Sequence, residues 1–173
     1  MKLIVKLLII VCCFLFSVSA KAKTYTNDEM KISMWMPEEM EIISDQHVNF
    51  GNCDGRVLRA EYLGLNLSLQ MGNCCNVEGQ EFNNYEFANR YLEVAKQTTL
   101  SFGLSAETYC IIPMAKHYYA TTLRKKDDNS FCSGELMTTI HGRSFILTCN
   151  GKADYLPVIR EIMESFSCVE EQT

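Results

Sequence analysis

The sequence has 173 residues, of which 47% are hydrophobic, 21% charged and 10% aromatic, a composition typical of a folded domain that excludes disorder and low complexity. Lys2 and Lys6 are the only charged residues among the first 20, so the remainder has 14 basic and 21 acidic residues and a net charge of −7. Because nucleic-acid binding relies on clustered Lys and Arg, and no such cluster is present, we expect no binding to nucleic acid.

Residues 1–20 have the organisation of a secretory signal peptide. A positively charged start is followed by an apolar run from Leu7 to Val18 and by small residues that suit a cleavage site. The apolar run is too short to cross a bilayer core of about 30 Å comfortably, although a retained membrane anchor is the alternative. We predict cleavage near Ala20, an extracytoplasmic location (periplasmic or secreted), no stable membrane insertion afterwards, and a single domain over residues 21–173.

The first half of the predicted domain shows the two-residue alternation of β-strands. Residues 30–36 alternate, and after a Pro-Glu turn a short strand resumes at residues 40–43. Residues 51–55 have the composition of a loop, which precedes a strand at residues 56–62. The clearest alternation follows at residues 63–71, where one face is leucine-rich and the other is small or polar, which predicts a strand packed on one side.

The second half begins and ends with a predicted helix. Residues 84–102 repeat apolar side chains at intervals of three and four, and Gly103 stands where such a helix would end. Asp154 is expected to cap the final helix, whose buried stripe ends at Phe166. Between the helices, we expect antiparallel strands at residues 108–112, 115–124, 131–140 and 144–149.

The order of these elements predicts an α+β fold, in which an antiparallel β-sheet is packed by two main helices. Strands, a helix, about four strands and a C-terminal helix follow one another. With the Pro37-Glu38 turn and the ending from Ser144 to Phe166, this order resembles the PsbP-like α/β sandwich superfamily over most of the chain. The resemblance implies a PsbP-like sandwich and a binding scaffold, because members of that superfamily are mostly non-enzymatic binding or accessory proteins. It transfers no site residue.

Seven cysteines remain after the signal peptide, an odd number for an oxidising compartment. Three disulfides and one free thiol are the simplest arrangement, and the odd cysteine makes a disulfide-linked dimer possible. Proximity favours a Cys132–Cys149 pair on a predicted hairpin, and a bond from Cys53 to one of the adjacent cysteines 74 and 75. Buried reduced thiols are the alternative. The candidate disulfide cysteines are Cys53, Cys74, Cys75, Cys110, Cys132, Cys149 and Cys168.

The sequence contains no motif that predicts catalysis, a cofactor or a metal. His117 and His141 fall on or beside the predicted sheet that carries Cys132 and Cys149, which is the basis for a thiol-dependent enzyme as one alternative. The histidines do not stand at zinc-ligand spacing from one another or from the cysteines, and Cys-x-x-Cys is absent. We therefore predict no enzyme, no catalytic or metal-binding residues, and no cofactor.

Trp35 is the only tryptophan, and Met34 and Met36 flank it. An exposed patch of Met and aromatic side chains would bind a protein, so these three residues are the candidate binding surface. The alternative, favoured by the regular strand alternation, places the methionines in the core.

These observations predict an exported, non-catalytic binding or accessory protein that recognises another protein or an envelope component. One alternative is an immunity or inhibitor protein, whose acidic surface would neutralise a basic toxin. The other is a thiol-dependent enzyme or redox protein.

Overall fold

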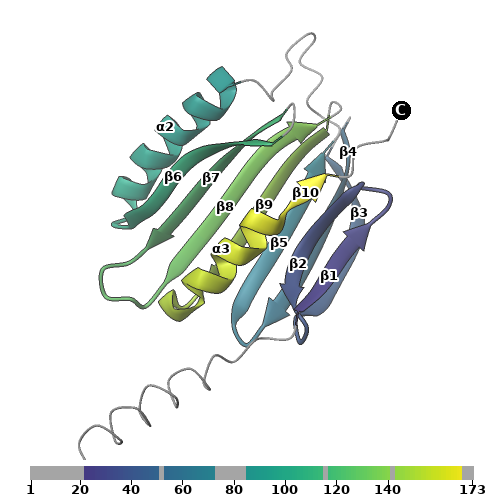
Figure 1. The fold of residues 1–173 in the computed structure, drawn as a ribbon, viewed down its shortest axis with the longest axis horizontal. Coiled ribbons are helices and arrows are strands. Elements are labelled where there is room, and N and C mark those ends of the chain that lie inside the picture. The colour runs from purple at the N-terminus through teal and green to yellow at the C-terminus, as the bar shows by residue number, and fades with distance from the viewer. Residues whose placement is uncertain (1–21, 51–52, 73–84, 115–116, 141–142, 169–173) are drawn as a thin grey trace, which may run out of the picture.

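The computed structural model describes residues 22–50, 53–72, 85–114, 117–140 and 143–168, whose strands form two sheets (Figure 1). The predicted signal peptide, Cys74 and Cys75, and the predicted turn at residues 141–142 lie outside these ranges. The smaller sheet has three strands in the order β1-β2-β10, and both pairings are antiparallel. Its strands are β1 (Ala22–Asn27), β2 (Ile32–Pro37) and β10 (Ser167–Cys168).

The larger sheet has seven strands in the order β3-β4-β5-β9-β8-β7-β6, and all of its pairings are antiparallel. Strand β9 returns beside β5, so the sheet is continuous from one edge to the other. Its strands are β3 (Glu41–Phe50), β4 (Cys53–Tyr62), β5 (Leu65–Gly72), β6 (Ser105–Met114), β7 (His117–Lys125), β8 (Cys132–Ile140) and β9 (Arg143–Gly151).

The main core lies on one face of the large sheet, beneath the small sheet and helix α3 (Leu156–Ser165). In β5, the alternation read from the sequence directs Leu67 and Leu69 into this core and exposes Gln70. Helix α3 contributes Ile159, Ile162 and Met163, each at most 2% exposed. The predicted buried stripe of the last helix is thus the stripe that packs on the sheet.

Gly134 in β8 lets α3 lie close to the sheet. A Cβ atom at this position would be 2.3 Å from Ile159 Cγ2 and 2.6 Å from Met163 Sδ. Both distances are far below the roughly 3.5 Å of an ordinary contact between non-bonded heavy atoms. The absence of a side chain at Gly134 therefore sets how deeply α3 sits, and with it the position of every side chain that α3 presents to the sheet.

Helix α2 (Tyr85–Ser101) packs on the opposite face of the large sheet, against β6 and β7. Ala120 of β7 forms a separate cluster with Ala88 and Leu92 of α2, whereas its neighbour Tyr119 belongs to the main core. Because adjacent strand residues point to opposite faces, α2 and α3 lie on opposite sides of the sheet. Within the described ranges, no helix has the length and apolar character needed to span a bilayer.

The predicted α+β class, with antiparallel strands and two main helices, is confirmed, but the strands form two sheets, β1 and β10 were not predicted, and several boundaries differ. Residues 51–55 were expected to be a loop, whereas β4 begins at Cys53 and pairs with β3. Strand β3 is longer than the predicted residues 40–43, because its polar second half is held by pairing with β4. The predicted strand at residues 63–71 begins only at Leu65, since Leu63 adopts a positive φ of 47° in the turn before it.

The expected cap of the last helix is also corrected. Asp154 lies inside a short 3₁₀ helix (Ala153–Tyr155), and α3 follows directly with Tyr155 in its N-cap position, which makes no side-chain capping hydrogen bond. Pro157 is in the first turn of α3, where its missing N–H costs nothing. The 3₁₀ turn thus takes the place of a side-chain cap at this helix start.

Candidate functional site

The proposed binding surface around the tryptophan is corrected by the burial of its methionines. Met34 and Met36 point from β2 into the main core and are 1% and 0% exposed. Trp35 points to the outer side of the small sheet and is half-buried, and its backbone N–H donates to Ser165 Oγ of α3 at 2.8 Å. Of the three candidate residues, strand alternation therefore leaves only Trp35 on the outer side, where it packs against the edge of the main core next to α3.

The described cysteines carry free thiols, so the arrangement of three disulfides is corrected. Cys110, Cys132, Cys149 and Cys168 are all unbridged, and the remaining cysteines can supply at most one intramolecular bond. The reason for the unformed hairpin bond is register, since Cys132 is opposite Gly151 and two residues out of step with Cys149. Diagonal neighbours on adjacent strands are about 7–8 Å apart, which is longer than the separation of Cα atoms that a disulfide usually bridges. The Cys132 thiol donates instead to the Lys152 carbonyl at 2.9 Å.

Burial also makes these thiols poor nucleophiles. Desolvation raises the pKa of Cys149 and of Cys168 to about 12, and it is the main cause of the raised pKa of Cys110 and Cys132. Reactive cysteines need the opposite shift, because the thiolate is the nucleophile. Among the described residues, no group of three or more His, Cys, Asp or Glu side chains is placed to hold a metal ion.

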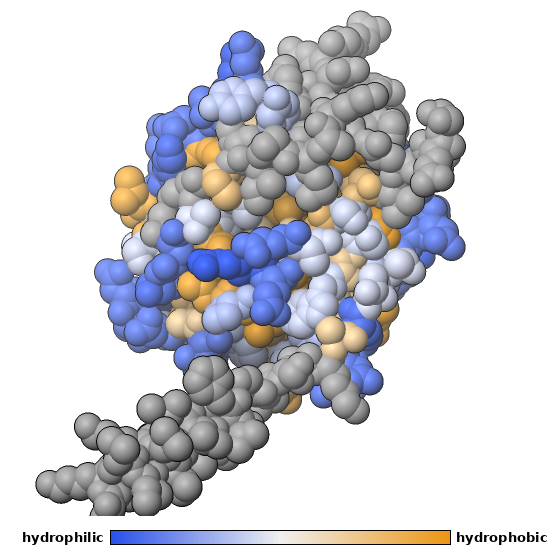
Figure 2. Space-filling model, in the orientation of Figure 1, coloured by the Kyte–Doolittle hydropathy of each residue, from blue (hydrophilic) through white to orange (hydrophobic). Residues whose placement is uncertain are grey.

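A groove between α3 and the edge of the large sheet is the candidate binding site. It has a volume of about 240 Å³ and lies on the face that carries α3, open to solvent on one side. Figure 2 shows hydrophilic residues across the middle of this face, with hydrophobic surface between them. The groove is lined from β6 by Thr108 and Cys110, from β7 by Thr121 and Leu123, and from α3 by Arg160, Met163 and Glu164.

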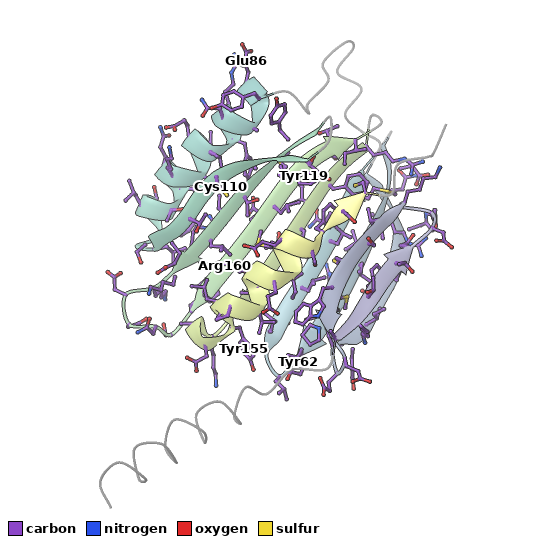
Figure 3. The ribbon with its side chains drawn as sticks, in the orientation of Figure 1. Tyr62, Glu86, Cys110, Tyr119, Tyr155 and Arg160 are labelled. Atoms are coloured by element: carbon purple, nitrogen blue, oxygen red, sulfur yellow. The ribbon has the colours of Figure 1, made fainter. Side chains whose placement is uncertain are left out.

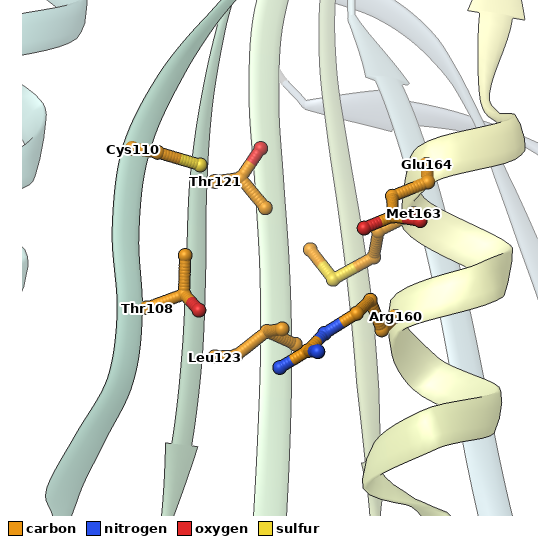
Figure 4. A pocket seen from close by; sticks show the side chains of 7 residues that line it. All are labelled: Thr108, Cys110, Thr121, Leu123, Arg160, Met163 and Glu164. Atoms are coloured by element: carbon orange, nitrogen blue, oxygen red, sulfur yellow. The ribbon is translucent and has the colours of Figure 1, made fainter.

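The two ends of the groove differ in charge. Arg160 reaches from α3 toward Thr108 and Leu123, while Glu164 lies level with Cys110 and Thr121 (Figure 4). Figure 3 shows Arg160 on α3 and Cys110 on β6 in the context of the whole fold. Both α3 side chains are exposed, and neither has an ion pair with the other or with any residue in the described ranges. The Glu164 carboxylate adds to desolvation in raising the pKa of Cys110. The groove is thus cationic at one end and anionic at the other.

The floor of the groove contains a buried hydroxyl that lacks a protein partner. Thr121 is only 5% exposed, and its Oγ1 has no hydrogen-bond partner in the part of the chain that the structure describes. A buried polar group without a hydrogen bond costs about 1–3 kcal/mol. Leu123 and Met163, which are 3% and 2% exposed, provide the apolar part of the floor. The groove therefore combines a charge at each end, an unused hydroxyl and an apolar base.

The sequence predicts the helix and the strands that form this groove, but not most of the residues that line it. Cys110 is one of the candidate disulfide cysteines, and Met163 belongs to the predicted buried stripe of the last helix, whereas the sequence gives no indication that Thr121, Arg160 and Glu164 form a site. One signal was available, since Arg160 and Glu164 are four residues apart and hence on the same side of the predicted helix. Which residues this side of the helix faces depends on how α3 packs on β6 and β7, two strands that are distant from it in the sequence.

Comparisons with known proteins establish the fold. No protein-family model matches the sequence, and no curated protein is significantly similar to it. The structure is similar to the solution structure of cyanobacterial PsbP (CyanoP) from Synechocystis sp. PCC 6803, with a TM-score of 0.54, 14% identity, and coverage of 88% of this chain and 95% of that chain.

Two further solved structures align over most of their length. The Saccharomyces cerevisiae Ran-binding protein Mog1p has a TM-score of 0.48 and 9% identity, with coverage of 88% of this chain and 97% of that chain. LpqN, involved in cell envelope biogenesis of Mycobacterium tuberculosis, has a TM-score of 0.43 and 9% identity, with coverage of 91% and 95%. The PsbP-like resemblance that the sequence suggested is confirmed at the level of the fold, on the similarity to CyanoP.

Proposed function

We propose that this chain is an exported, non-catalytic binding or accessory protein, and that it holds a protein partner on the face formed by α3. The observation that carries the proposal is the groove between α3 and β6–β7, with Arg160, Glu164 and the Thr121 hydroxyl unpartnered among the described residues. Folded proteins rarely bury a polar side chain without a partner, so such a group at an open groove is typical of a site that an external ligand completes.

The other side of α3 adds a second contact region. Strand β2, which carries Trp35, lies on the opposite side of the helix from the groove (Figure 1). Tryptophan and arginine are enriched among the residues that contribute most to binding energy at interfaces. Here Arg160 lies on the side of α3 that faces the groove, and Trp35 of β2 lies on the other side of the helix. A partner that lies across α3 would contact both.

The size of the groove favours side-chain groups of a partner over a large ligand. Its volume of about 240 Å³ is below the roughly 300–1,000 Å³ of sites for drug-sized ligands. The raised pKa values of the described thiols speak against a thiol-dependent enzyme, because they disfavour the thiolate that such chemistry requires.

Site-specific photo-crosslinking in the native host tests this function. A photoreactive residue replaces Glu161, which is exposed on α3 and follows Arg160 in the chain. In the control it replaces Gln70, which is exposed on the other face of the sheet. We expect one stoichiometric crosslinked protein from position 161, none from position 70, and loss of the crosslink when Arg160→Ala is added. Equal crosslinking from both positions would contradict the proposed face.

Export and dimerisation are tested on the same preparations. We expect the purified protein to begin after Ala20 and to be recovered outside the cytoplasm. A non-reducing gel shows whether a disulfide-linked dimer forms through the odd cysteine. An N-terminus that retains residues 1–20 in the mature protein would refute cleavage.

A further inference from the structure

The arrangement of charges in the groove indicates what kind of group it binds. Arg160 and Glu164 are one helical turn apart on α3, a separation of about 6 Å along the axis. They do not neutralise each other by pairing, since neither makes an ion pair within the described ranges. The order Arg then Glu at this spacing is also the less favourable one for pairing within a helix.

A ligand with a single charge fits this groove poorly. An anion drawn to Arg160 would lie within about one turn of the Glu164 carboxylate, which repels it. A cation drawn to Glu164 would meet the same problem with Arg160. At such distances the two Coulomb terms are comparable, so they largely cancel for a single charge and add for a ligand that carries both.

We propose that the groove is a binding site for a zwitterion, with its carboxylate at Arg160, its ammonium group at Glu164, and a short aliphatic chain between them. This assignment deepens the proposed binding function and rests on the same groove. Arginine binds carboxylates through paired N–H donors, which suits the carboxylate end. At the other end, the Thr121 hydroxyl accepts a hydrogen bond from the ammonium group.

The floor between the two charges matches the aliphatic chain. Leu123 and Met163 are buried there, and Met163 lies between Arg160 and Glu164 on the α3 side (Figure 4). Thr121 lies at the Glu164 end, so its unused hydroxyl is at the level where the ammonium group is expected. Lysine carries such a pair of charges, as the free amino acid through its α-carboxylate and ε-ammonium groups, or as the last residue of a peptide.

Titration of the purified protein with a series of ω-amino acids tests the assignment by NMR chemical-shift changes. The probes are glycine, 4-aminobutyrate, 6-aminohexanoate and 8-aminooctanoate, with hexanoate and hexylamine as singly charged controls. We expect an optimum at intermediate length and affinities at least about tenfold lower for both controls, the difference that one charged hydrogen bond of about 1.5 kcal/mol makes. Equal binding of hexanoate, or no dependence on chain length, would overturn the proposal.

Charge variants separate recognition from general electrostatics. Arg160→Gln and Glu164→Gln should each weaken 6-aminohexanoate binding by about tenfold or more, and Arg160→Glu alone should abolish it. The double variant Arg160→Glu/Glu164→Arg should bind again, because a flexible zwitterion can reverse its direction. Glu161→Gln, on the same helix and outside the groove, is the matched control and should leave binding unchanged. Failure of the double variant to bind, in a folded protein, would contradict the charge pairing.

The unused hydroxyl has its own matched pair of variants. Thr121→Val should weaken binding of 6-aminohexanoate several-fold. Thr122→Val makes the same change on the same strand but on the opposite face, where Oγ1 is also buried without a partner in the described ranges, and should leave binding unchanged. If both variants weaken binding alike, the effect is not specific to the groove and Thr121 is not in the site.

A peptide ending in lysine, compared with its C-terminal amide and with free lysine, distinguishes the source of the zwitterion. Binding of the acid-ended peptide but not the amide indicates a chain end, and binding of free lysine alone indicates a small molecule. If no zwitterion binds while crosslinking at position 161 succeeds, this inference fails and the proposed function stands. If zwitterions bind and crosslinking fails, the groove is a small-molecule site and the protein-partner proposal is refuted.

Discussion

Substitution of Gly134 by alanine tests the packing that positions the site. The new Cβ would be 2.3 Å from Ile159 Cγ2, about 1.2 Å closer than an ordinary contact of about 3.5 Å, and 2.6 Å from Met163 Sδ. Neither side chain can move away freely, because both are buried between α3 and the sheet. The helix itself must therefore shift outward by about 1 Å.

The expected cost follows from two opposing effects. Overpacking of a dense core costs typically 1–3 kcal/mol. Alanine is about 0.5–1 kcal/mol better than glycine within a strand, because the unfolded chain has less freedom to lose. We expect Gly134→Ala to lower the free energy of unfolding by about 1–2 kcal/mol, measured from urea titrations with an unchanged m-value.

A second substitution shows whether the clash is the cause. Ile159→Ala removes the Cγ2 atom that the new Cβ would meet, at its own cost of about 2–5 kcal/mol as a large-to-small core change. If the clash causes the loss, the double variant is more stable than the sum of the single effects predicts, by about 1 kcal/mol or more. Additive effects, or a Gly134→Ala variant as stable as the parent, would refute the explanation of how α3 is held.

Three other predictions concern stability. Thr121→Val and Thr122→Val should each raise the free energy of unfolding by about 1 kcal/mol in urea titrations, because each removes a buried hydroxyl without a partner in the described ranges. A lower free energy of unfolding in both variants would contradict this. Burial raises the pKa of Cys149 from 9.0 to about 12, so above pH 9 the unfolded thiol ionises before the native one. This thiol alone should lower stability by about 1.4 kcal/mol per pH unit there, so the slope of stability against pH should be less steep in Cys149→Ala, and an unchanged slope would contradict its burial. Arg56→Met removes the ion pairs to Glu29 and to Asp45, where the Arg56 Nε to Asp45 Oδ1 distance is 2.6 Å. It should lower the free energy of unfolding by about 1 kcal/mol at low salt and by less at high salt, and an equal loss in both would refute an electrostatic role.

The sequence was sufficient to predict the parts of the fold that bury regular apolar patterns. The alternation in β5 and the apolar stripe of α3 are local signals, and the apolar residues of both elements are buried in the core as predicted. Strand β1 was missed because Ala22–Asn27 has few apolar residues and is held as a strand by its pairing with β2. The two-residue β10 has no pattern of its own and exists through its pairing with β2.

The burial of the cysteines and methionines could be predicted only in part. Hydrophobic side chains at alternate positions belong to the core, which explains Met34 and Met36, and the same rule applies to Cys149 as a small apolar residue. The predicted bond between Cys132 and Cys149 rested on their position on the two strands of a predicted hairpin. The pairing of Ile140 with Arg143 puts Cys132 opposite Gly151, so the two cysteines are two residues out of register. The strand ends predicted from the sequence give this same register, so the mismatch could have been found by counting along the two strands.

The groove could not be predicted because none of its properties belongs to a single element. Arg160 and Glu164 on a helix are ordinary solvent-exposed charges, and Thr121 in a strand is an ordinary β-branched residue. They become a site because Gly134 lets α3 approach the sheet closely, which buries Thr121 and leaves the two charges on the side of the helix that faces β6 and β7. A protein that kept this fold for stability alone would gain from valine at position 121, since the hydroxyl is buried without a partner in the described ranges. The same gain is expected at Thr122, whose hydroxyl is also buried without a partner in the described ranges but lies on the other face of the sheet. The observation that favours binding is therefore the position of the Thr121 hydroxyl in an open groove between two unpaired charges.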